Sequence, residues 1–194
     1  MTDWVALGDR AIRFARPAGV SPRALVTAAR AWPGAIDVVV ARDDVAVYFA
    51  GTPHVTARDI AALAGLPGDA SPAREHVVRV VYDGPDLASV AAASGMTVED
   101  VIAVHAAGEY AVETMGFLPG FAYLTGVDPR LALPRRATPR TRVPAGAVAI
   151  AGGYTSVYPL ASPGGWHLLG HTEVVMFGPD GALLGLGDRV RFER

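Results

Sequence analysis

The sequence has 194 residues, enough for one large domain or two small ones that bury a core. Its hydrophobic fraction of 51%, charged fraction of 19% and net charge of −2 are those of an ordinary soluble globular protein. Because a charge near zero offers no field that attracts a polyanion, nucleic acid is not expected as a partner. The absence of cysteine excludes disulfides and thiolate catalysis, and it fits a cytoplasmic protein.

Two further features of the composition restrict the chemistry. Residues 1–10 lack the apolar core of a signal peptide, and no window reaches the roughly 18 apolar residues of a membrane helix, so no membrane association is expected. All 17 basic residues are arginine. Without lysine, a Walker-type phosphate loop and Schiff-base chemistry are excluded. A phosphate or carboxylate must be held by arginine or by backbone N–H groups.

The first 65 or so residues alternate strand and helix signals. Ser21 and Thr56 stand where helix caps are expected, and Pro22 suits a first helical position. If Val77–Val81 supplies a last strand, the order predicts a ferredoxin-like α+β domain. The predicted elements are a strand at Ala11–Ala15, a helix from Pro22 to about Trp32, a hairpin of Ile36–Ala41 and Val45–Ala50, and a helix at Ala57–Ala64.

The turn-rich segment Gly68–Pro72 is the predicted boundary, with an N-terminal α+β domain at 1–72 and a second domain at 73–194. Helices are expected at Asp86–Ser94 and Val98–Ala107. The later pattern of short strands between glycines and prolines indicates a β-barrel or sandwich. These strands are predicted at Tyr110–Met115, Ala147–Ala151, Trp166–Leu169, Glu173–Phe177, Leu183–Leu184 and Arg189–Phe192.

The stretch from Gly116 to Pro144 is rich in proline and shows little strand or helix period. Long ordered loops of this kind usually bind a ligand or a partner. The stretch begins a succession of motifs that resembles the allophanate hydrolase subunit 1 family, which includes the B subunit of 5-oxoprolinase and the KipI-type kinase inhibitors. The elements that carry the resemblance are Gly116–Leu124, Asp128–Leu131, Pro134–Arg136, Thr138–Arg140, Val143–Gly146, Tyr158-Pro159, Ser162–Trp166 and Gly187–Phe192.

This resemblance implies a fold and an activity. It implies an N-terminal α+β domain followed by a mainly-β, cyclophilin-like barrel. It also implies a homologous second subunit, of the same type as allophanate hydrolase subunit 2 or the C subunit of 5-oxoprolinase, and a third subunit. The implied activity is the ATP-dependent opening of 5-oxoproline to glutamate by the complex. Allophanate or urea metabolism, as hydrolase or carboxyltransferase, and inhibition of a histidine kinase are the alternatives.

Several residues of the proline-rich stretch are predicted to bind the substrate. Phe117 and Tyr123 could stack on a small planar ligand beside Pro119, although the same aromatic rings could simply fill a core. Arg135, Arg136, Arg140 and Arg142 concentrate positive charge, which suits either an anionic ligand or a subunit interface. Arg140 is the preferred ligand-binding arginine.

Two residues are predicted as catalytic acid or base groups. His105 has a suitable pKa for proton transfer, but it could equally stabilise the end of a helix. Glu113 lies among apolar neighbours on a predicted strand. Metal binding is not expected, because His167 and His171 are about 13 Å apart along a strand. The resemblance places arginine at position 171, where this chain has histidine. No ATP motif is present, so ATP, with Mg²⁺, is expected to be shared with the partner subunit.

Overall fold

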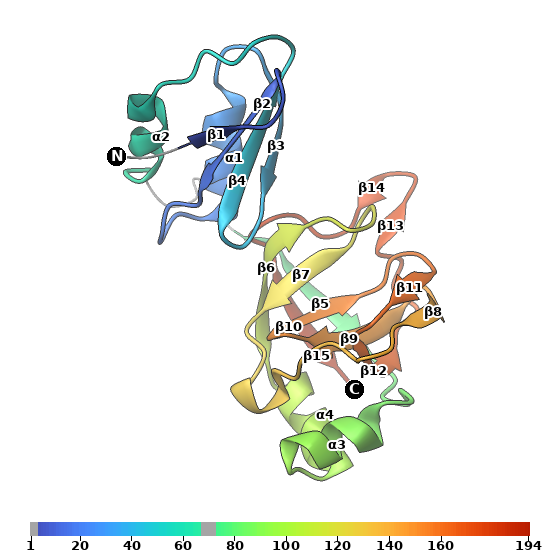
Figure 1. Cartoon of the computed structure of the whole chain (residues 1–194). Helices are drawn as coiled ribbons and strands as arrows, with labels where there is room; N and C mark the ends of the chain where they lie inside the picture. Colours follow the sequence, from blue (N-terminus) through green and yellow to red (C-terminus); the bar gives the residue numbers. More distant parts are fainter. Residues whose placement is uncertain (1–3, 67–72) are drawn as a thin grey trace. The chain divides into compact units, whose positions relative to one another are not determined.

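The computed structural model describes residues 4–66 and 73–194 (Figure 1). The chain divides into two compact units, Met1–Pro72 and Ala73–Arg194. The predicted boundary at Gly68–Pro72 lies outside the described residues.

The N-terminal unit is an antiparallel sheet with the order β1-β2-β4-β3 and two helices. Both predicted helix caps are present: the Ser21 hydroxyl accepts the Ala24 N–H, and Thr56 forms a capping box with Asp59. The elements are β1 (Trp4–Ala6), β2 (Ala11–Ala15), α1 (Pro22–Arg30), β3 (Ala35–Val40), β4 (Asp44–Phe49) and α2 (Ala57–Leu63).

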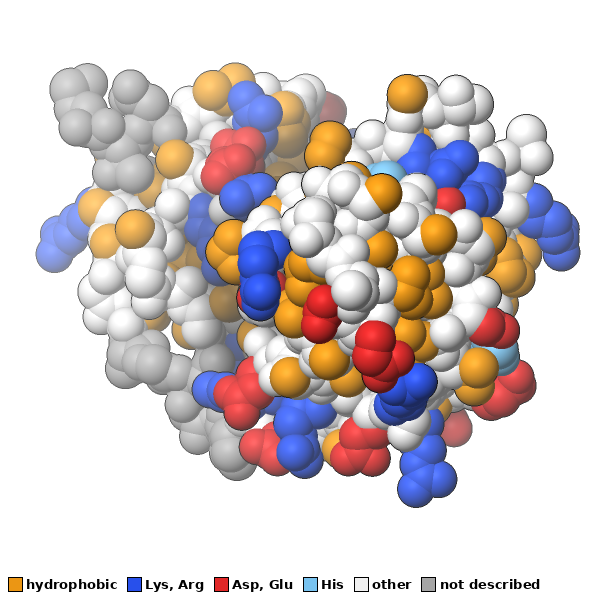
Figure 2. Space-filling view, turned by 90° about the horizontal axis from the view of Figure 1, so that it is seen from below, with side chains coloured by type: hydrophobic (Ala, Val, Ile, Leu, Met, Phe, Trp, Pro, Cys, Tyr) orange, Lys and Arg blue, Asp and Glu red, His pale blue; other side chains and the backbone are white. Residues whose placement is uncertain are grey.

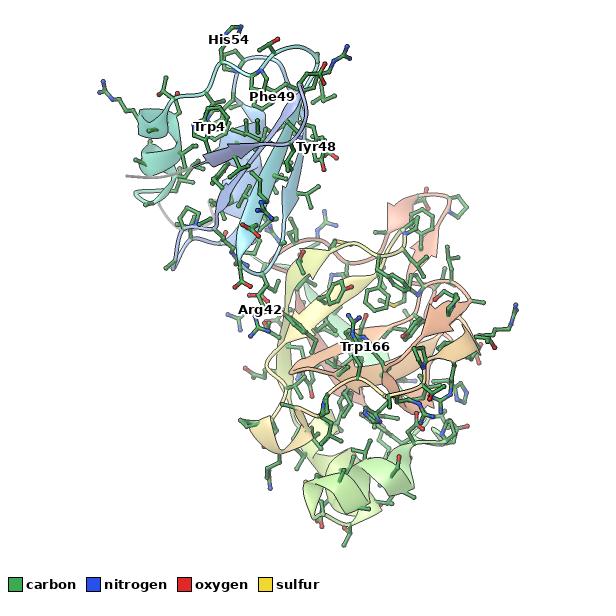
Figure 3. The ribbon with its side chains drawn as sticks, viewed as in Figure 1. Trp4, Arg42, Tyr48, Phe49, His54 and Trp166 are labelled. Carbon is green, nitrogen blue, oxygen red and sulfur yellow. The ribbon has the colours of Figure 1, made fainter. Side chains whose placement is uncertain are left out.

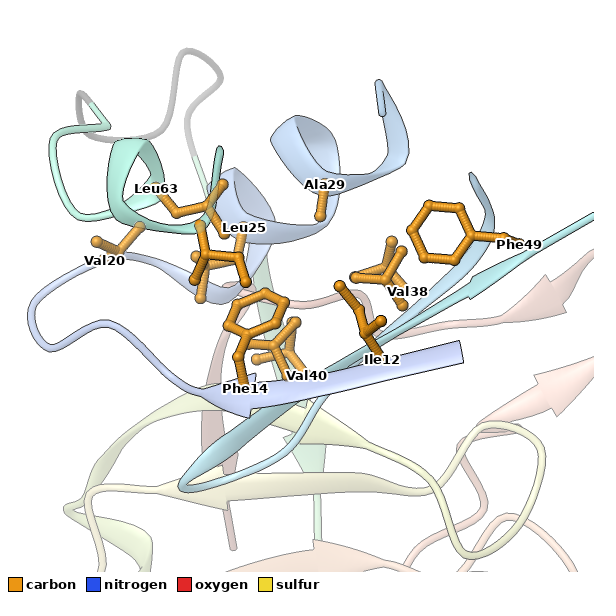
Figure 4. Packing of buried hydrophobic residues seen from close by; sticks show 12 residues of the cluster. Ile12, Phe14, Val20, Leu25, Ala29, Val38, Val40, Phe49 and Leu63 are labelled. Atoms are coloured by element: carbon orange, nitrogen blue, oxygen red, sulfur yellow. The ribbon is translucent and has the colours of Figure 1, made fainter. Parts of the chain in front are cut away.

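The core of this unit lies between the sheet and its helices (Figure 4). Alternate residues of β4, such as Val45 and Val47, are buried, as expected for a sheet with one covered face. They pack with Leu25 of α1 and Ile60 of α2. The alternation that predicted these strands therefore also selects the buried face.

The prediction that Val77–Val81 completes this sheet is wrong. The strand in that region, β5 (Glu75–Arg79), belongs to the C-terminal unit, where it pairs with β15 (Arg189–Glu193). The outer place beside β2 is taken by β1 instead. Because β1 has only three residues, all exposed, it carries no alternation that the sequence could reveal.

The C-terminal unit contains a seven-stranded sheet with the order β12-β9-β10-β7-β6-β15-β5. The sheet curls until its two end strands are joined by a bridge, in which Val81 and His171 exchange two backbone hydrogen bonds of 2.9 Å. The remaining strands of this sheet are β6 (Glu109–Met115), β7 (Ala122–Thr125), β9 (Ala147–Ala151), β10 (Tyr154–Val157) and β12 (His167–His171).

Two small strand pairs and two helices accompany this sheet. β8 (Arg140–Val143) pairs with β11 (Ser162–Gly164), and β13 (Phe177–Gly178) pairs with β14 (Gly181–Ala182). The predicted strands at Glu173–Phe177 and Leu183–Leu184 are wrong, since the pairing is confined to the tight β13–β14 hairpin. The stretch 116–144, expected to be irregular, contains β7, β8 and the short 3₁₀ turn Pro129–Leu131.

Helices α3 (Leu87–Ser94) and α4 (Val98–Ala106) follow β5 and lie at one end of the curled sheet (Figure 1). They bury Val90, Val101 and Ile102 against Ile150 and Leu169 of the sheet. On the face seen in Figure 2, hydrophobic side chains are interspersed with acidic and basic ones. Across residues 4–66 and 73–194, no single helix is long and apolar enough to cross a membrane. Helices α3 and α4, with a bend of 92° between them, reach the length and apolar composition of a membrane span only when they are counted together.

The chain after β5 runs unusually close to β12. The Gly84 N–H donates to the Leu169 carbonyl, and the Asp86 N–H donates to the Leu168 carbonyl. A Cβ atom on Gly170 would lie 2.1 Å from the Val81 carbonyl oxygen, and one on Gly84 would lie 2.2 Å from that of Leu168. Glycine at both positions is therefore required for the two segments to meet.

Candidate functional site

A six-residue loop, residues 116–121, connects β6 to β7 and begins the candidate site. Its ends are joined by hydrogen bonds from the Gly116 N–H to the Phe121 carbonyl and from the Phe121 N–H to the Leu118 carbonyl. Phe117 has a φ of 73° and is the one non-glycine residue with positive φ in the described chain. Its side chain is 60% exposed. A bulky residue in this conformation costs roughly 1–3 kcal/mol, and such strain is concentrated at functional sites.

The loop places Phe121 at the centre of an aromatic cluster. The Phe121 ring is buried and contacts Tyr123, Tyr158 and Trp166 edge-on, with ring centroids 5.0, 5.3 and 5.5 Å away. The exposed Phe117 packs edge-on against Phe121, with ring centroids 5.4 Å apart. These geometries are those that aromatic quadrupoles favour. Figure 3 labels Trp166 among the strands of the C-terminal unit.

A cavity of about 200 Å³ opens beside this aromatic cluster. We call it the aromatic cavity. It is smaller than the roughly 300–1,000 Å³ of sites that enclose drug-sized ligands, so it suits a small planar molecule. The residues that line it are Phe117, Phe121, Tyr123, Arg135, Pro139, Tyr158, Pro163, Gly164, Gly165 and Trp166.

Arg135 supplies the positive charge of the aromatic cavity. Its side chain is exposed at the cavity wall, and it forms no hydrogen bond or ion pair with other residues in 4–66 or 73–194. Burial raises the pKa values of Tyr123 and Tyr158, while the charge of Arg135 lowers them to a smaller extent. Both phenols are therefore neutral hydrogen-bonding groups near neutral pH. The combination of aromatic rings and an available guanidinium suits a small ring that carries a carboxylate.

Arg140, the arginine preferred from the sequence, is held by an acidic residue instead. Asp86 is 3% exposed, and its Oδ1 accepts hydrogen bonds from Arg136 Nη1 at 2.7 Å and Arg140 Nη2 at 2.8 Å. Its Oδ2 accepts the Leu168 N–H at 2.7 Å. We call these three charged residues the Asp86 cluster. Through Asp86, the cluster connects the start of α3 with the loop before β8, with the first residue of β8 and, by the Leu168 N–H, with β12.

The Asp86 cluster carries one carboxylate for two guanidinium groups. Burial raises the pKa of Asp86, but the hydrogen bonds from Arg140 and Leu168 and the two positive charges outweigh it, so the pKa is lowered. Arg136 Nε and Arg140 Nη1 are buried without a partner among the described residues. The positions favour a structural role for Arg140, behind the wall of the aromatic cavity.

His105, predicted as a catalytic group, is fully buried in the core of the C-terminal unit. Because the Thr155 hydroxyl donates to the Ala149 carbonyl, His105 Nε2 donates to Thr155 Oγ1 at 2.9 Å and Nδ1 accepts from the Tyr82 hydroxyl at 2.8 Å. Its ring stacks on Phe192 at 4.8 Å. Burial lowers its pKa to about 3, so the ring is neutral. This position favours a structural role, since a substrate could reach His105 only if the core opened.

Glu113, the second predicted catalytic residue, lies beside the aromatic cavity without lining it. Its Oε2 accepts a hydrogen bond of 2.6 Å from the Tyr154 hydroxyl. The Tyr154 ring packs edge-on against Tyr123, with centroids 5.6 Å apart. Glu113 therefore fixes a tyrosine that supports the cavity wall. Pro119 is exposed at the tip of the loop and does not line the cavity.

The two histidines of β12 have separate partners. His167 Nε2 contacts the Pro134 carbonyl oxygen at 2.9 Å, and His171 Nδ1 contacts Asp83 Oδ1 at 2.9 Å. Within the described residues, no group of three or more His, Asp or Glu side chains could hold a metal ion. The cavity residues that the sequence left without a role, Tyr158 and Trp166, come from two neighbouring motifs, and the fold brings them together with Phe121 and Tyr123, which lie at least 35 residues earlier in the chain.

Comparison with known proteins places the chain in a family. Residues 6–183 match the family described as carboxyltransferase domain, subdomain C and D. The chain belongs to this family. The match of this carboxyltransferase domain spans both units and includes the aromatic cavity. The resemblance inferred from the motif order is thereby confirmed.

Several relatives of this chain are named after an enzyme. The chain is 50% identical over 121 residues to the B subunit of 5-oxoprolinase from Escherichia coli O157:H7, and the match covers 59% of this chain and 56% of the relative. It is 47% identical over 114 residues to the B subunit of 5-oxoprolinase from Bacillus subtilis (strain 168), covering 57% of this chain and 48% of the relative. The chain thus spans about half the length of the curated relatives it matches.

Solved structures extend the carboxyltransferase comparison over the whole chain. TTHA0988 matches with a TM-score of 0.77 and 42% identity, covering 95% of this chain and 39% of that chain. PH0987 of Pyrococcus horikoshii matches with a TM-score of 0.59 and 30% identity, covering 98% and 96%. The K. lactis urea amidolyase has a TM-score of 0.74 at 19% identity, covering 99% of this chain and 15% of that one, and shows the fold alone.

Proposed function

We propose that this chain is the B-type subunit of a heteromeric, ATP-dependent 5-oxoprolinase. The observation that carries the proposal is the aromatic cavity, which is lined by the positively charged side chain of Arg135. 5-Oxoproline is a five-membered lactam with one carboxylate, which is the class of ligand that such a cavity suits. The names of relatives that are 46–50% identical to parts of this chain support the same activity.

In this proposal Arg135 binds the carboxylate of 5-oxoproline and the rings of Tyr123 and Trp166 contact the lactam. Hydrolysis breaks the lactam C–N bond, adds the oxygen of water to the carbonyl carbon and delivers a proton to the nitrogen, which gives glutamate. Orientation of the ring by two separate contacts is the contribution we assign to this chain. Glu113 stays a predicted catalytic acid or base, and Phe117 a predicted substrate contact.

The aromatic cavity does not fit a nucleotide. A nucleoside triphosphate exceeds the small planar ligands that about 200 Å³ accommodates. The guanidinium groups of Arg136 and Arg140 are already directed at Asp86. We therefore assign ATP and Mg²⁺ to a site formed with the homologous partner subunit, and derive no chemical step of this chain from them.

The proposal also includes the domain description, the further subunit and the cellular location. The cyclophilin-like description of residues 73–194, the treatment of 1–72 and 73–194 as domains, and a third subunit are parts of it. A cytoplasmic location is also part of it, because an ATP-dependent enzyme of small metabolites would use cytoplasmic ATP.

The direct test is ATP hydrolysis by the chain reconstituted with its partner subunits. 5-Oxoproline, allophanate and urea are supplied in parallel, and glutamate formation is measured with the first. The proposal expects ATP turnover that depends on 5-oxoproline and on the presence of all subunits. ATP turnover that depends on allophanate or urea and not on 5-oxoproline would contradict it and favour the alternative, a subunit in allophanate or urea metabolism.

A further inference from the structure

The terminal strand β5 has a free edge with a defined set of backbone groups. On its inner side, the Val80 N–H donates to the Glu193 carbonyl at 2.7 Å, and the Arg74 carbonyl accepts from the Arg189 N–H at 2.8 Å. Backbone groups of even-numbered residues therefore point toward β15. Those of the odd-numbered residues point the other way, as the Val81 bridge to His171 illustrates.

Along Glu75–Arg79 no other described strand pairs with this outer edge. The N–H and C=O groups of Glu75, Val77 and Arg79 are thus available for a further strand. An open groove of about 720 Å³ borders the edge, between β5 and the segment from His171 to Val174. Val77 is 44% exposed there. Exposed edge strands without lysine, proline or a bulge are templates for pairing with another chain.

The side chains of β5 are complementary to those of a second copy of the strand. The sequence from 75 to 79 is Glu-His-Val-Val-Arg. If two copies pair antiparallel about Val77, Glu75 of each copy stands opposite Arg79 of the other, and Val77 stands opposite Val77. Among residues 4–66 and 73–194, neither Glu75 nor Arg79 forms an ion pair that would compete.

The charges of Glu75 and Arg79 fix the centre of symmetry. A two-fold axis at Glu75 or at Arg79 would bring two like charges together. An axis at His76 or Val78 would use the same outward backbone groups, but it would place Val77 opposite Glu75 or opposite Arg79 and leave the opposite charges unmatched. Only the axis at Val77 places Glu75 opposite Arg79 on both sides, and the three hydrogen-bonded pairs would exchange about six hydrogen bonds.

We propose that this edge is an isologous interface through which two copies of the chain join their β5 strands into one continuous sheet. The occupant of the groove is the β5 strand of a second copy, because the edge is self-complementary in charge and in hydrogen-bonding groups. The interface is separate from the aromatic cavity, so that two copies would bring two cavities into one assembly. It can be measured on the chain alone, without ATP or substrate.

The test is a charge exchange followed by sedimentation of the full chain. Glu75→Arg places arginine opposite Arg79 of the second copy, and Arg79→Glu places glutamate opposite Glu75. Each single variant should dimerise at least about tenfold more weakly than the natural chain, because two attractive pairs become repulsive. Mixing the two variants restores both opposite-charge pairs, as does the double exchange in one chain, and both should dimerise like the natural chain.

Two controls separate the interface from folding. Arg142→Glu changes an exposed arginine of β8 and should leave dimerisation unchanged. Val77→Pro removes the outward N–H that only the second copy would use, so it should abolish the dimer while far-UV circular dichroism stays that of the natural chain. A natural chain that sediments as a monomer at high micromolar concentration would overturn the proposal. So would single variants that dimerise as well as the natural chain, or a mixture that stays monomeric.

Discussion

Replacing Asp86 by alanine should destabilise the C-terminal unit by about 2–4 kcal/mol. The change removes the carboxylate that Arg136, Arg140 and the Leu168 N–H share. Removing one partner of a buried ion pair costs about 3–5 kcal/mol, because the remaining charge stays buried and unpaired. The side chains of Arg136 and Arg140 are 33% and 23% exposed. Because water can partly hydrate them after the substitution, the expected cost falls to about 2–4 kcal/mol.

The measurement is urea unfolding followed by tryptophan fluorescence. Trp166 is the sole tryptophan of the C-terminal unit. In a chain that carries Trp4→Phe and Trp32→Phe, the tryptophan fluorescence therefore reports on that unit alone. Asp83→Ala is the matched control, because the Asp83 contact with His171 is exposed and should be worth less than about 1 kcal/mol. If Asp86→Ala costs no more than this control, the Asp86 cluster does not support the cavity wall as argued.

Three further changes test other parts of the structure. Phe117→Gly should be about 1 kcal/mol more stable than Phe117→Ala in the same urea assay, because only glycine relieves the positive φ; equal stabilities would contradict the strain. As the pH falls below about 6.5, His105 becomes protonated in the unfolded chain but stays neutral in the folded one, where burial lowers its pKa to about 3. Stability should therefore fall by up to about 1.4 kcal/mol per pH unit toward pH 3, and His105→Gln should lessen this slope. Gly170→Ala, whose Cβ would meet the Val81 carbonyl oxygen at 2.1 Å, should lower the unfolding midpoint more than Gly178→Ala, whose Cβ would meet nothing nearer than a Val175 methyl group at 3.7 Å.

Most of the N-terminal unit could be predicted from the sequence because its signals are local. Ser21 with Pro22 marks the start of α1, and alternation in β4 marks one covered face. The membership of β5 could not be predicted in this way. Its pairing with β15 joins residues more than a hundred positions apart, and an apolar run does not reveal which sheet it enters.

The candidate site shows the same division between local and long-range information. The motif order identified the stretch that forms the aromatic cavity, and Phe117 and Tyr123 line it as predicted contacts would. The choice between Arg135 and Arg140 depended on Asp86, 54 residues before Arg140 and on another element. His105 has the residue type of a catalytic base, but its burial among Tyr82, Thr155 and Phe192 depends on the tertiary structure.

The most direct test of the proposed function is the steady-state kinetics of the reconstituted complex with Arg135→Gln, measured against 5-oxoproline. Loss of a charged hydrogen bond of about 1.5–3 kcal/mol should raise KM about 10- to 150-fold while kcat changes less. Arg142→Gln, an exposed arginine outside the cavity, should keep the natural KM. An Arg135→Gln complex with the natural KM for 5-oxoproline would contradict the assignment of the aromatic cavity as the substrate site.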